Sequence, residues 1–231
     1  MARRGRARGR LRALLRAVRR VLVWALVGVL GWVILYAFVD PPSTLTIEAE
    51  RWRLGSVRRA GVELSALSPE VRLVFPAAED ARFCAHPGID LEAVREAVAE
   101  AGRLRGASTL TQQVAKNAFL WQGRGWVRKG LEAGFAVLIE FLWPKRRILE
   151  TYLSIAEMGE GVFGLGAAAE AHFGKPAAEL TTREAALIAA ALPSPRTRDP
   201  ARPSAWLRGR AAAIEAGART LAADGRGACL L

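Results

Sequence analysis

The stretch GASTLTQQVAKN, residues 106–117, does most to decide the fold, because it predicts a helix with two chemically different faces. Ser108 can cap this helix where it leaves a glycine-containing loop. The apolar positions recur at the spacing of one helical face: Leu110, Val114 and Ala118. The polar positions form two pairs four residues apart: Gln112 with Lys116, and Gln113 with Asn117. Free amides, amide side chains and an ammonium suit a phosphate-bearing sugar, although an ordinary amphipathic surface helix explains the pattern equally well.

The sequence on both sides of this stretch predicts a mainly α domain. Four further helix starts are indicated by a capping residue or a proline: Ser68 with Pro69, Asp90, Pro144, and Thr181 with Glu184. Apolar periodicity predicts helices over residues 127–143 and from about Ser204 to Ala223. Two weakly alternating stretches, Thr44–Glu50 and Val62–Leu64, predict short strands or extended connectors.

The charge of the chain is concentrated at its N-terminus. The 231 residues carry a formal net charge of +12, and nine arginines lie among the first 20 positions. The remainder holds 25 basic and 22 acidic side chains, and a balance so mildly basic argues against a nucleic-acid partner. The two cysteines and two histidines lack the spacing of a zinc site, so no residue is predicted as a metal ligand.

An uncharged apolar run, Val21–Val39, predicts a transmembrane helix. Its length as a helix is roughly 28 Å, close to the hydrocarbon core of a bilayer at about 30 Å. A cleaved signal peptide is the main alternative, but the run is longer than the usual apolar segment and no A-x-A cleavage site follows it. The preceding arginines predict a cytoplasmic basic tail over residues 1–20, so that a linker or stem (residues 40–64) and a folded domain (residues 65–231) are exported.

A second stretch, EDARFCAHPGID over residues 79–90, opens with two adjacent carboxylates after an apolar segment. Apolar surroundings raise a carboxyl pKa, which is how a glutamate is tuned for acid or base catalysis, so Glu79 is a candidate catalytic group. A solvated turn is the alternative, and it is favoured when Glu79 and Asp80 are considered alone.

The two cysteines are expected to remain separate. Cys84 is predicted to be a small buried thiol and not a nucleophile activated by His86. Cys229 lies in a polar, glycine-containing tail that should fray, so we expect no disulfide between Cys84 and Cys229.

A third stretch places cations beside a carboxylate. Arg124, Arg128 and Glu132 fall four residues apart, and Lys129 follows Arg128. Glu132 lies in an otherwise apolar helix and needs a cation, which Arg128 supplies from one turn away. A structural ion pair is the alternative, and it is the better interpretation of this stretch in isolation.

Together these stretches resemble the family-51 glycosyltransferases, the transglycosylase module of bifunctional penicillin-binding proteins. The family patterns E-D-x-x-F-x-x-H-x-G-x-D, G-x-S-T-x-T-Q-Q-x-x-K-N, R-K-x-x-E and K-x-x-I-L-E-x-Y-L-N are matched in order by residues 79–90, 106–117, 128–132 and 145–154. A fifth family stretch resembles residues 161–175, and the resemblance covers about residues 65–195. The chain is most similar to monofunctional members, since no Ser-x-x-Lys motif of a transpeptidase appears. It departs from the family pattern at three positions: Pro76, Ser154 in place of the usual Asn, and His172 in place of the usual Tyr.

The resemblance implies a lysozyme-like α fold and a peptidoglycan glycosyltransferase. Its substrate would be lipid II, polymerised into glycan strands with inversion at the anomeric carbon and release of undecaprenyl diphosphate. By position, Glu79 is the general base and Glu132 the second carboxylate. Glu132 would orient the cations, hold a divalent cation (Mg²⁺ or Mn²⁺) at the diphosphate, or assist its departure. Candidates for binding the diphosphate are Lys116, Arg124, Arg128 and Lys129. Candidates for positioning the substrate are Asp80, Phe83, Ser108, Thr109, Gln112, Gln113 and Asn117.

The resemblance also implies partners and a location. The partners would be lipid II, the growing glycan chain, the membrane and other cell-wall synthesis proteins. The catalytic domain would be periplasmic, on a single-pass anchor in the inner membrane. A lysozyme-like hydrolase or lytic transglycosylase is one alternative, but it would not need the cations at Lys116, Arg124 and Arg128. A non-enzymatic membrane scaffold is another, and it predicts that loss of the Glu79 carboxylate leaves function unchanged.

Overall fold

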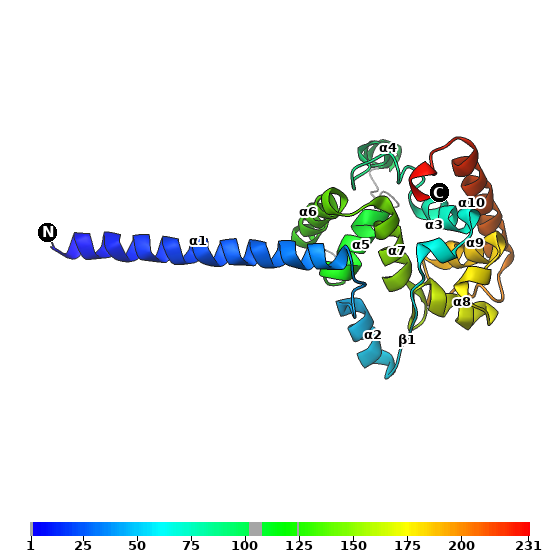
Figure 1. Ribbon diagram of the computed structural model, residues 1–231, viewed down its shortest axis with the longest axis horizontal. Helices are drawn as coiled ribbons and strands as arrows, with labels where there is room; N and C mark the ends of the chain where they lie inside the picture. Colours follow the sequence, from blue (N-terminus) through cyan, green and yellow to red (C-terminus); the bar gives the residue numbers. More distant parts are fainter. Residues whose placement is uncertain (1, 102–107, 124) are drawn as a thin grey trace. The chain divides into compact units, whose positions relative to one another are not determined.

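The structure is a computed structural model that describes residues 2–101, 108–123 and 125–231 (Figure 1). The chain divides into two compact units, one ending at Val39 and the other spanning Asp40–Leu231. Arg124 and the first two residues of the stretch 106–117 lie outside the described residues.

The first unit contains one long helix, α1 (Ala2–Tyr36). Its part Leu14–Tyr36 has a mean hydropathy of 2.0 and is long and apolar enough to cross a membrane, by length and composition. The predicted N-terminal apolar helix is therefore confirmed, with its apolar part starting seven residues earlier than Val21.

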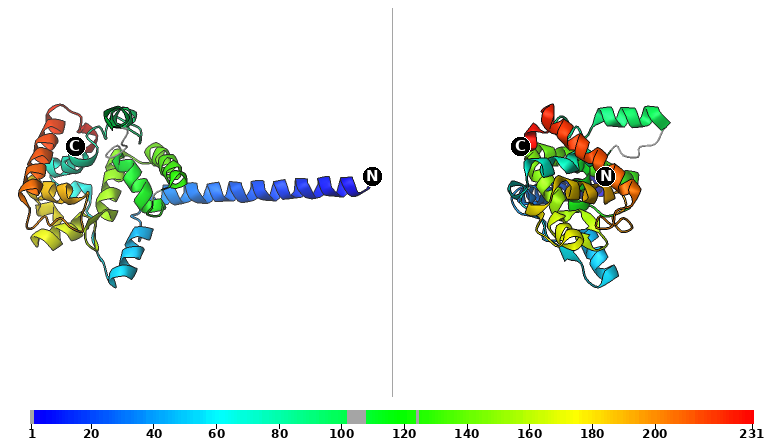
Figure 2. Two further views of the ribbon diagram at one scale, coloured as in Figure 1. Left: turned by 180° about the vertical axis from the view of Figure 1, so that it is seen from behind. Right: turned by 90° about the vertical axis from the view of Figure 1, so that its right-hand side faces the viewer.

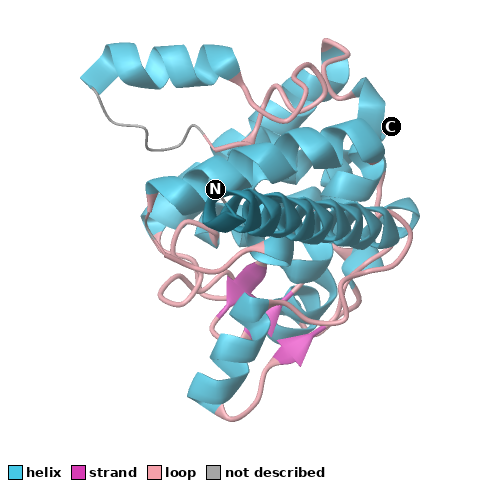
Figure 3. Ribbon diagram, turned by 90° about the vertical axis from the view of Figure 1, so that its left-hand side faces the viewer, coloured by secondary structure: helices cyan, strands magenta, loops and turns pink. Residues whose placement is uncertain are grey.

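The second unit is mainly α, as the sequence predicts (Figure 3). Its α-helices are α2 (Leu45–Leu54), α3 (Pro69–Glu79), α4 (Leu91–Ala101), α5 (Leu110–Phe119), α6 (Trp126–Leu142), α7 (Lys145–Ile155), α8 (Leu165–Phe173), α9 (Thr182–Ala191) and α10 (Ala205–Ala223). Short 3-10 helices among the described residues are η1 (Leu64–Ala66), η2 (Ala177–Glu179) and η3 (Ala228–Leu230). The strands β1 (Arg58–Arg59), β2 (Glu157–Gly159) and β3 (Val162–Phe163) form a small sheet in the order β1-β3-β2. Strand β1 is parallel to β3, with Arg58 opposite Val162, and β2 is antiparallel to β3.

Local capping explains where most of these helices begin. Ser68 caps α3 by accepting from the Val71 amide, and Thr181 forms a capping box with Glu184 at the start of α9. Both caps agree with the prediction from sequence. The predicted cap of α5 is wrong by one residue, because Thr109 and not Ser108 accepts the amide of Gln112. The Gln112 side chain completes a capping box by accepting from the Thr109 amide, and this second bond favours Thr109.

The prediction of strands around Thr44–Glu50 is wrong, since these residues enter helix α2. Thr44 caps the helix by accepting from the Ile47 amide, and Gly55 ends it with φ +79°. Ile47 and Glu50 lie three residues apart and are the buried positions of α2, a helical spacing that the apparent alternation concealed. At Val62–Leu64 the extended connector, and not the strand, is the correct alternative: Glu63 is extended (φ −70°, ψ 132°) before η1 begins, and the strand pairing occurs earlier, at Arg58–Arg59.

The helices of the second unit pack in two groups, which together position the site. Helix α10 packs against α3 and α9, and α3 packs against α9; we call these three the α3 group. Helix α5 packs against α6 and α7, and we call these three the α5 group (Figures 1 and 2). The buried rings of Phe75 on α3 and Tyr152 on α7 meet edge to face across the two groups, 6.5 Å apart.

The expectation of separate cysteines is wrong, because Cys84 and Cys229 form a disulfide with their Cα atoms 5.8 Å apart. The C-terminal tail does not fray as expected. Leu230 in η3 is fully buried, and its carbonyl accepts from the guanidinium of Arg146 at 3.1 Å. Buried apolar contact and backbone hydrogen bonds therefore hold Cys229 beside Cys84.

Candidate active site

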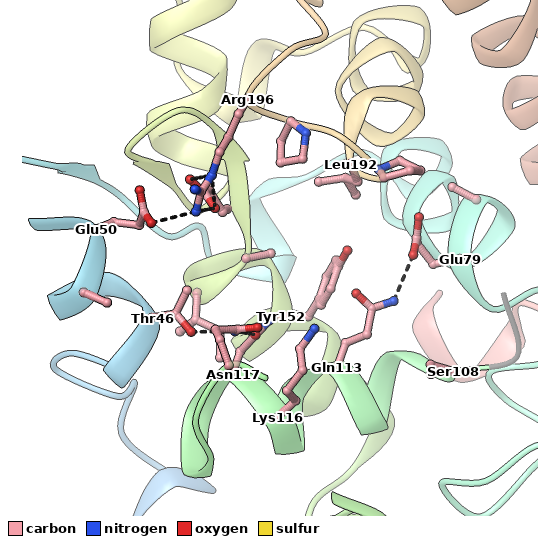
Figure 4. Close-up of a pocket in the computed structure, with 18 of the residues that line it drawn as sticks. Thr46, Glu50, Glu79, Ser108, Gln113, Lys116, Asn117, Tyr152, Leu192 and Arg196 are labelled. Carbon is pink, nitrogen blue, oxygen red and sulfur yellow. Dashed lines mark hydrogen bonds and ion pairs between the residues drawn. The ribbon is translucent and has the colours of Figure 1, made fainter. Parts of the chain in front are cut away.

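A cavity of about 810 Å³ lies in the second unit, and helices of both groups line it (Figure 4). Glu79 contributes from the end of α3, while Gln113, Lys116 and Asn117 contribute from one face of α5. The wall continues through Tyr152 of α7. The polar face predicted for residues 106–117 therefore faces a cavity large enough for a sizeable ligand, which a merely solvated surface helix would not need.

Glu79 is the half-buried last residue of α3, so its carboxylate projects where the helix ends. Gln113 Nε2 donates to Glu79 Oε2 at 2.9 Å (Figure 4). Burial raises the pKa of Glu79 above its ordinary value, and neighbouring Asp80 adds to this. The hydrogen bond from Gln113 and the charges of Arg210 and Lys116 act in the opposite direction. A carboxylate with a raised pKa is a stronger proton acceptor than an exposed one, which suits a general base.

Asp80 is buried, and both of its carboxylate oxygens have partners within the domain. Its Oδ2 accepts from the Leu110 amide at 2.9 Å, and its Oδ1 lies 2.9 Å from His86 Nε2. The amide of Gly88 donates to His86 Nδ1 at 3.2 Å, so in a neutral ring Nε2 carries the proton and donates to Asp80. Asp80 thereby fixes the chain directly after Glu79 to the start of α5.

Asp80, His86 and Asp90 also bring possible metal-ligating atoms within 4.8 Å of one another. These atoms already have partners: Asp90 accepts two bonds from Arg82, at 2.8 and 3.0 Å, and Asp80 and His86 bond each other. The hydrogen bonds and charges therefore account for this cluster without an ion.

The cations predicted from sequence gather around Glu132. This side chain is buried, and Arg128 Nη1 donates to its Oε2 at 2.6 Å. Lys129 Nζ bonds the other carboxylate oxygen and also reaches Ser108 Oγ at 3.2 Å. Arg128 Nε is buried and has no hydrogen-bond partner among the described residues. Arg124, predicted to join these cations, lies outside the described residues.

Lys116 interacts electrostatically with both Glu132 and Glu79. We call Lys116, Arg128 and Lys129, with Glu132, the cation cluster. Burial lowers the pKa of Lys116, while the charges of Glu132 and Glu79 raise it and those of Arg128 and Lys129 lower it further. The charges of both carboxylates therefore act on this ammonium, which lines the large cavity together with Glu79.

Six of the described residues predicted to bind substrate do not line the large cavity: Asp80, Phe83, Thr109, Gln112, Arg128 and Lys129. Asp80, Arg128 and Lys129 have the partners given above, and the other three lie inside the fold. Thr109 and Gln112 are buried in the capping box of α5, and Thr109 Oγ1 also donates to the Gly88 carbonyl at 2.6 Å. Phe83 is a core residue, with Lys145 Nζ 4.5 Å from its ring centroid. Thr109 does border a smaller cavity of about 270 Å³, which Glu79, Asp80 and Ser108 also line. Their predicted contacts with substrate remain a prediction.

The sequence did not point to the opposite end of the large cavity. Arg196 lies there and pairs with Glu50 of α2 at 2.7 Å and with Glu157 of β2 at 2.9 Å (Figure 4). Arg210 of α10 also lines the cavity and donates to the Ala78 carbonyl at 3.3 Å. These partners lie up to 146 residues apart in the sequence, so no local pattern could reveal them.

Similarity to known proteins shows the family of this chain. A family model described as Transglycosylase matches residues 48–218. The chain belongs to the transglycosylase family. It is 52% identical over 203 residues to the biosynthetic peptidoglycan transglycosylase of Rhodospirillum centenum, covering 86% of this chain and 87% of the relative. It is 47% identical over 213 residues to the protein of that name from Jannaschia sp., covering 89% of each. It is 46% identical to that from Xanthomonas campestris pv. campestris, covering 88% of this chain and 87% of the relative.

Proposed function

We propose that this protein is a peptidoglycan glycosyltransferase of cell-wall synthesis that polymerises lipid II into glycan strands, releasing undecaprenyl diphosphate. The observation that carries the proposal is that Glu79, a half-buried proton acceptor, and Lys116 line one cavity, with Lys129 bonded to Ser108 of the cavity wall and Arg128 and Lys129 both bonded to Glu132. Inverting transfer to an acceptor hydroxyl needs a base on one side and stabilisation of a departing diphosphate on the other. The similarity to biosynthetic peptidoglycan transglycosylases supports the same reaction.

Glu79 acts as the general base in this proposal. It removes the proton from the 4-hydroxyl of the acceptor sugar as that oxygen attacks the anomeric carbon of the donor. The bond from Gln113 holds Oε2, which leaves Oε1 as the oxygen that accepts the proton. The raised pKa of Glu79 increases its basicity.

The cation cluster stabilises the diphosphate leaving group. Arg128 and Lys129 share the carboxylate of Glu132, which fixes both side chains and reduces their mutual repulsion. We assign Glu132 to orienting the cations, because both of its oxygens already have a cationic partner. A carboxylate so engaged is a poor ligand for Mg²⁺ or Mn²⁺, which favours direct recognition of the diphosphate by side chains over a metal at Glu132.

We further propose that α1 anchors the chain in the inner membrane, with its arginine-rich start in the cytoplasm and residues 40–231 in the periplasm. The positive-inside rule supports this orientation. The Cys84–Cys229 disulfide supports it independently, because structural disulfides persist in oxidising compartments such as the bacterial periplasm. An anchored enzyme shares its bilayer with the lipid of its substrate.

A polymerisation assay with labelled lipid II tests the proposal. The purified full-length protein should produce uncrosslinked glycan, and moenomycin, which mimics the lipid-linked donor in this family, should block it. Purified glycan strands should remain intact in a parallel incubation. Cleavage of those strands would favour a lytic enzyme, and absence of both activities would favour a scaffold.

A further inference from the structure

Glu79 and the cation cluster come from different packing groups, so their separation depends on how the groups are held together. Glu79 ends α3, while Lys116 belongs to α5 and Arg128 to α6. In the proposed reaction, the base must reach the attacking hydroxyl while the cations contact the departing diphosphate of the same substrate pair. A displacement of about 1 Å in such a geometry can cost roughly 100-fold in rate.

The C-terminal strap, residues 225–231, contacts both groups. On the α3 side, Gly227 packs so closely that a Cβ there would lie 2.5 Å from Leu73 Cδ2. The buried Leu230 offers its carbonyl to Arg72 of α3 at 3.5 Å and to Arg146 of α7 at 3.1 Å. The Leu230 carbonyl oxygen thus accepts hydrogen bonds from both the α3 group and the α5 group.

The disulfide joins this strap to the loop that follows Glu79. That loop, residues 80–89, is already fixed to the α5 group by three hydrogen bonds. Asp80 accepts from the Leu110 amide, the Gly88 carbonyl accepts from Thr109, and the His86 carbonyl accepts from Lys145 at 2.7 Å. Cys84 adds a covalent link from the same loop to the strap, and the strap packs against α3 at Leu73.

We propose that the Cys84–Cys229 disulfide and the strap are positioning elements of the glycosyltransferase, which hold the Glu79 carboxylate at its working distance from the cation cluster. The proposal rests on the function proposed above. The cysteines contact no reacting atom in this scheme; they act through the loop and α3. Opening the disulfide should displace the base without removing a group that binds the diphosphate.

Four forms of the full-length protein test this proposal: wild type, Cys84→Ser, Cys229→Ser and the double variant, each with and without a phosphine reductant. We expect kcat for lipid II polymerisation to fall about 10- to 100-fold in every variant and in the reduced wild type. KM and moenomycin affinity should change less than about threefold, because the cation cluster is intact. Reductant should have no further effect on the double variant, which is the matched control.

The pH–rate profile separates positioning from general loss of stability. A loosened loop admits water to Glu79, which relieves the burial that raises its pKa. The acid limb of kcat should therefore move to lower pH in the reduced and substituted forms. Wild-type kcat and an unmoved acid limb in folded variants would overturn the proposal.

Amide hydrogen exchange gives a readout that does not depend on activity. Residues 79–89 should lose protection when the disulfide opens, while α6 retains it. Unchanged exchange over residues 79–89 would refute positioning even if the wild type polymerises lipid II. A wild type that fails to polymerise but loses this protection would contradict the proposed function and leave the strap's effect on the loop supported. If a serine variant fails to fold, the reduced wild type supplies the same comparison.

Discussion

Glu79 and Glu132 are the two carboxylates assigned to the proposed site, and their surroundings differ in almost every respect. Glu79 is half-buried, receives one amide hydrogen bond, and has its pKa raised by burial. Glu132 is fully buried and bonds two cations, Arg128 and Lys129. The difference teaches that burial alone does not set the role of a carboxylate: a carboxylate without a close cation can exchange protons, whereas one held between two cations serves to fix them.

Removing the proton-accepting capacity of Glu79 should have the largest effect. Glu79→Gln keeps the shape but cannot accept a proton, so the polymerisation rate should fall about 10²–10⁴-fold. Moenomycin affinity, measured by titration, should stay near wild type because the cation cluster is unchanged. Glu79→Asp is the matched control, since it retains a carboxylate and should recover part of the rate. Loss of inhibitor binding in Glu79→Gln would show that the roles of the two carboxylates are misassigned.

Breaking the pair at Glu132 should affect binding and rate together. Arg128→Ala removes a cation 2.6 Å from Glu132 and should lower inhibitor affinity and kcat in parallel. Breaking a buried pair costs about 3–5 kcal/mol, and Lys129 should keep the loss near the lower end. Thermal unfolding and inhibitor titration measure the two effects, with Arg128→Lys as a charge-retaining control. A folded Arg128→Ala that binds moenomycin normally contradicts the proposed diphosphate contact.

Loss of a capping bond should have a smaller effect, and comparing the capping boxes at Thr109 and Thr181 shows whether that effect reaches the proposed site. Thr109→Ala and Thr181→Ala each remove the same capping bond, and each should lower the free energy of unfolding by about 0.5–2 kcal/mol. Only Thr109→Ala also removes a bond to Gly88 in the loop after Glu79, so only this variant should lose activity. Denaturant melts and kcat measurements provide the comparison. Equal activity in the two variants would show that the loop does not depend on Thr109.

The smallest effect concerns stability against pH. Because burial raises the pKa of Glu79, the folded state binds this proton more tightly than the unfolded state does. Glu79 is therefore most favourable at low pH, and its contribution to stability falls as pH rises from the ordinary carboxyl pKa through the raised one. Glu79→Gln should consequently melt slightly above wild type at neutral pH and lose this advantage in acid. A Glu132→Gln variant should instead melt below wild type at neutral pH, since Arg128 and Lys129 lose the carboxylate charge that they share.

Local signals in the sequence predicted much of this molecule, and long-range contacts limited the rest. Ser68 and Thr181 cap the helices expected of them, because a cap depends on residues three apart. The polar face of α5 and the pair between Arg128 and Glu132 are likewise readable within one or two turns. The ion pairs of Arg196 were not predictable, since Glu50 is 146 residues away on a helix that the alternation rule misassigned as a strand.

The disulfide shows most clearly where local reasoning fails. Cys84 and Cys229 lie 145 residues apart, and the polar character of the tail suggested fraying. The decisive fact is that Leu230, beside Cys229, is buried and hydrogen-bonded by Arg146. The burial of the Leu230 side chain against residues distant in the sequence cannot be inferred from the composition of the tail alone.

The length of chain closed by this disulfide has a consequence for biogenesis. A cross-link enclosing 145 residues removes conformational freedom from the unfolded chain, stabilising the native state on the order of 5 kcal/mol by the loop-entropy argument. In the proposed orientation, the newly made chain meets a reducing cytoplasm and lacks that contribution until residues 40–231 have crossed the membrane. The same sequence is thus easier to keep unfolded while it is translocated and harder to unfold once it has arrived. With this orientation, the enzyme acquires that part of its stability on the side of the membrane where it works.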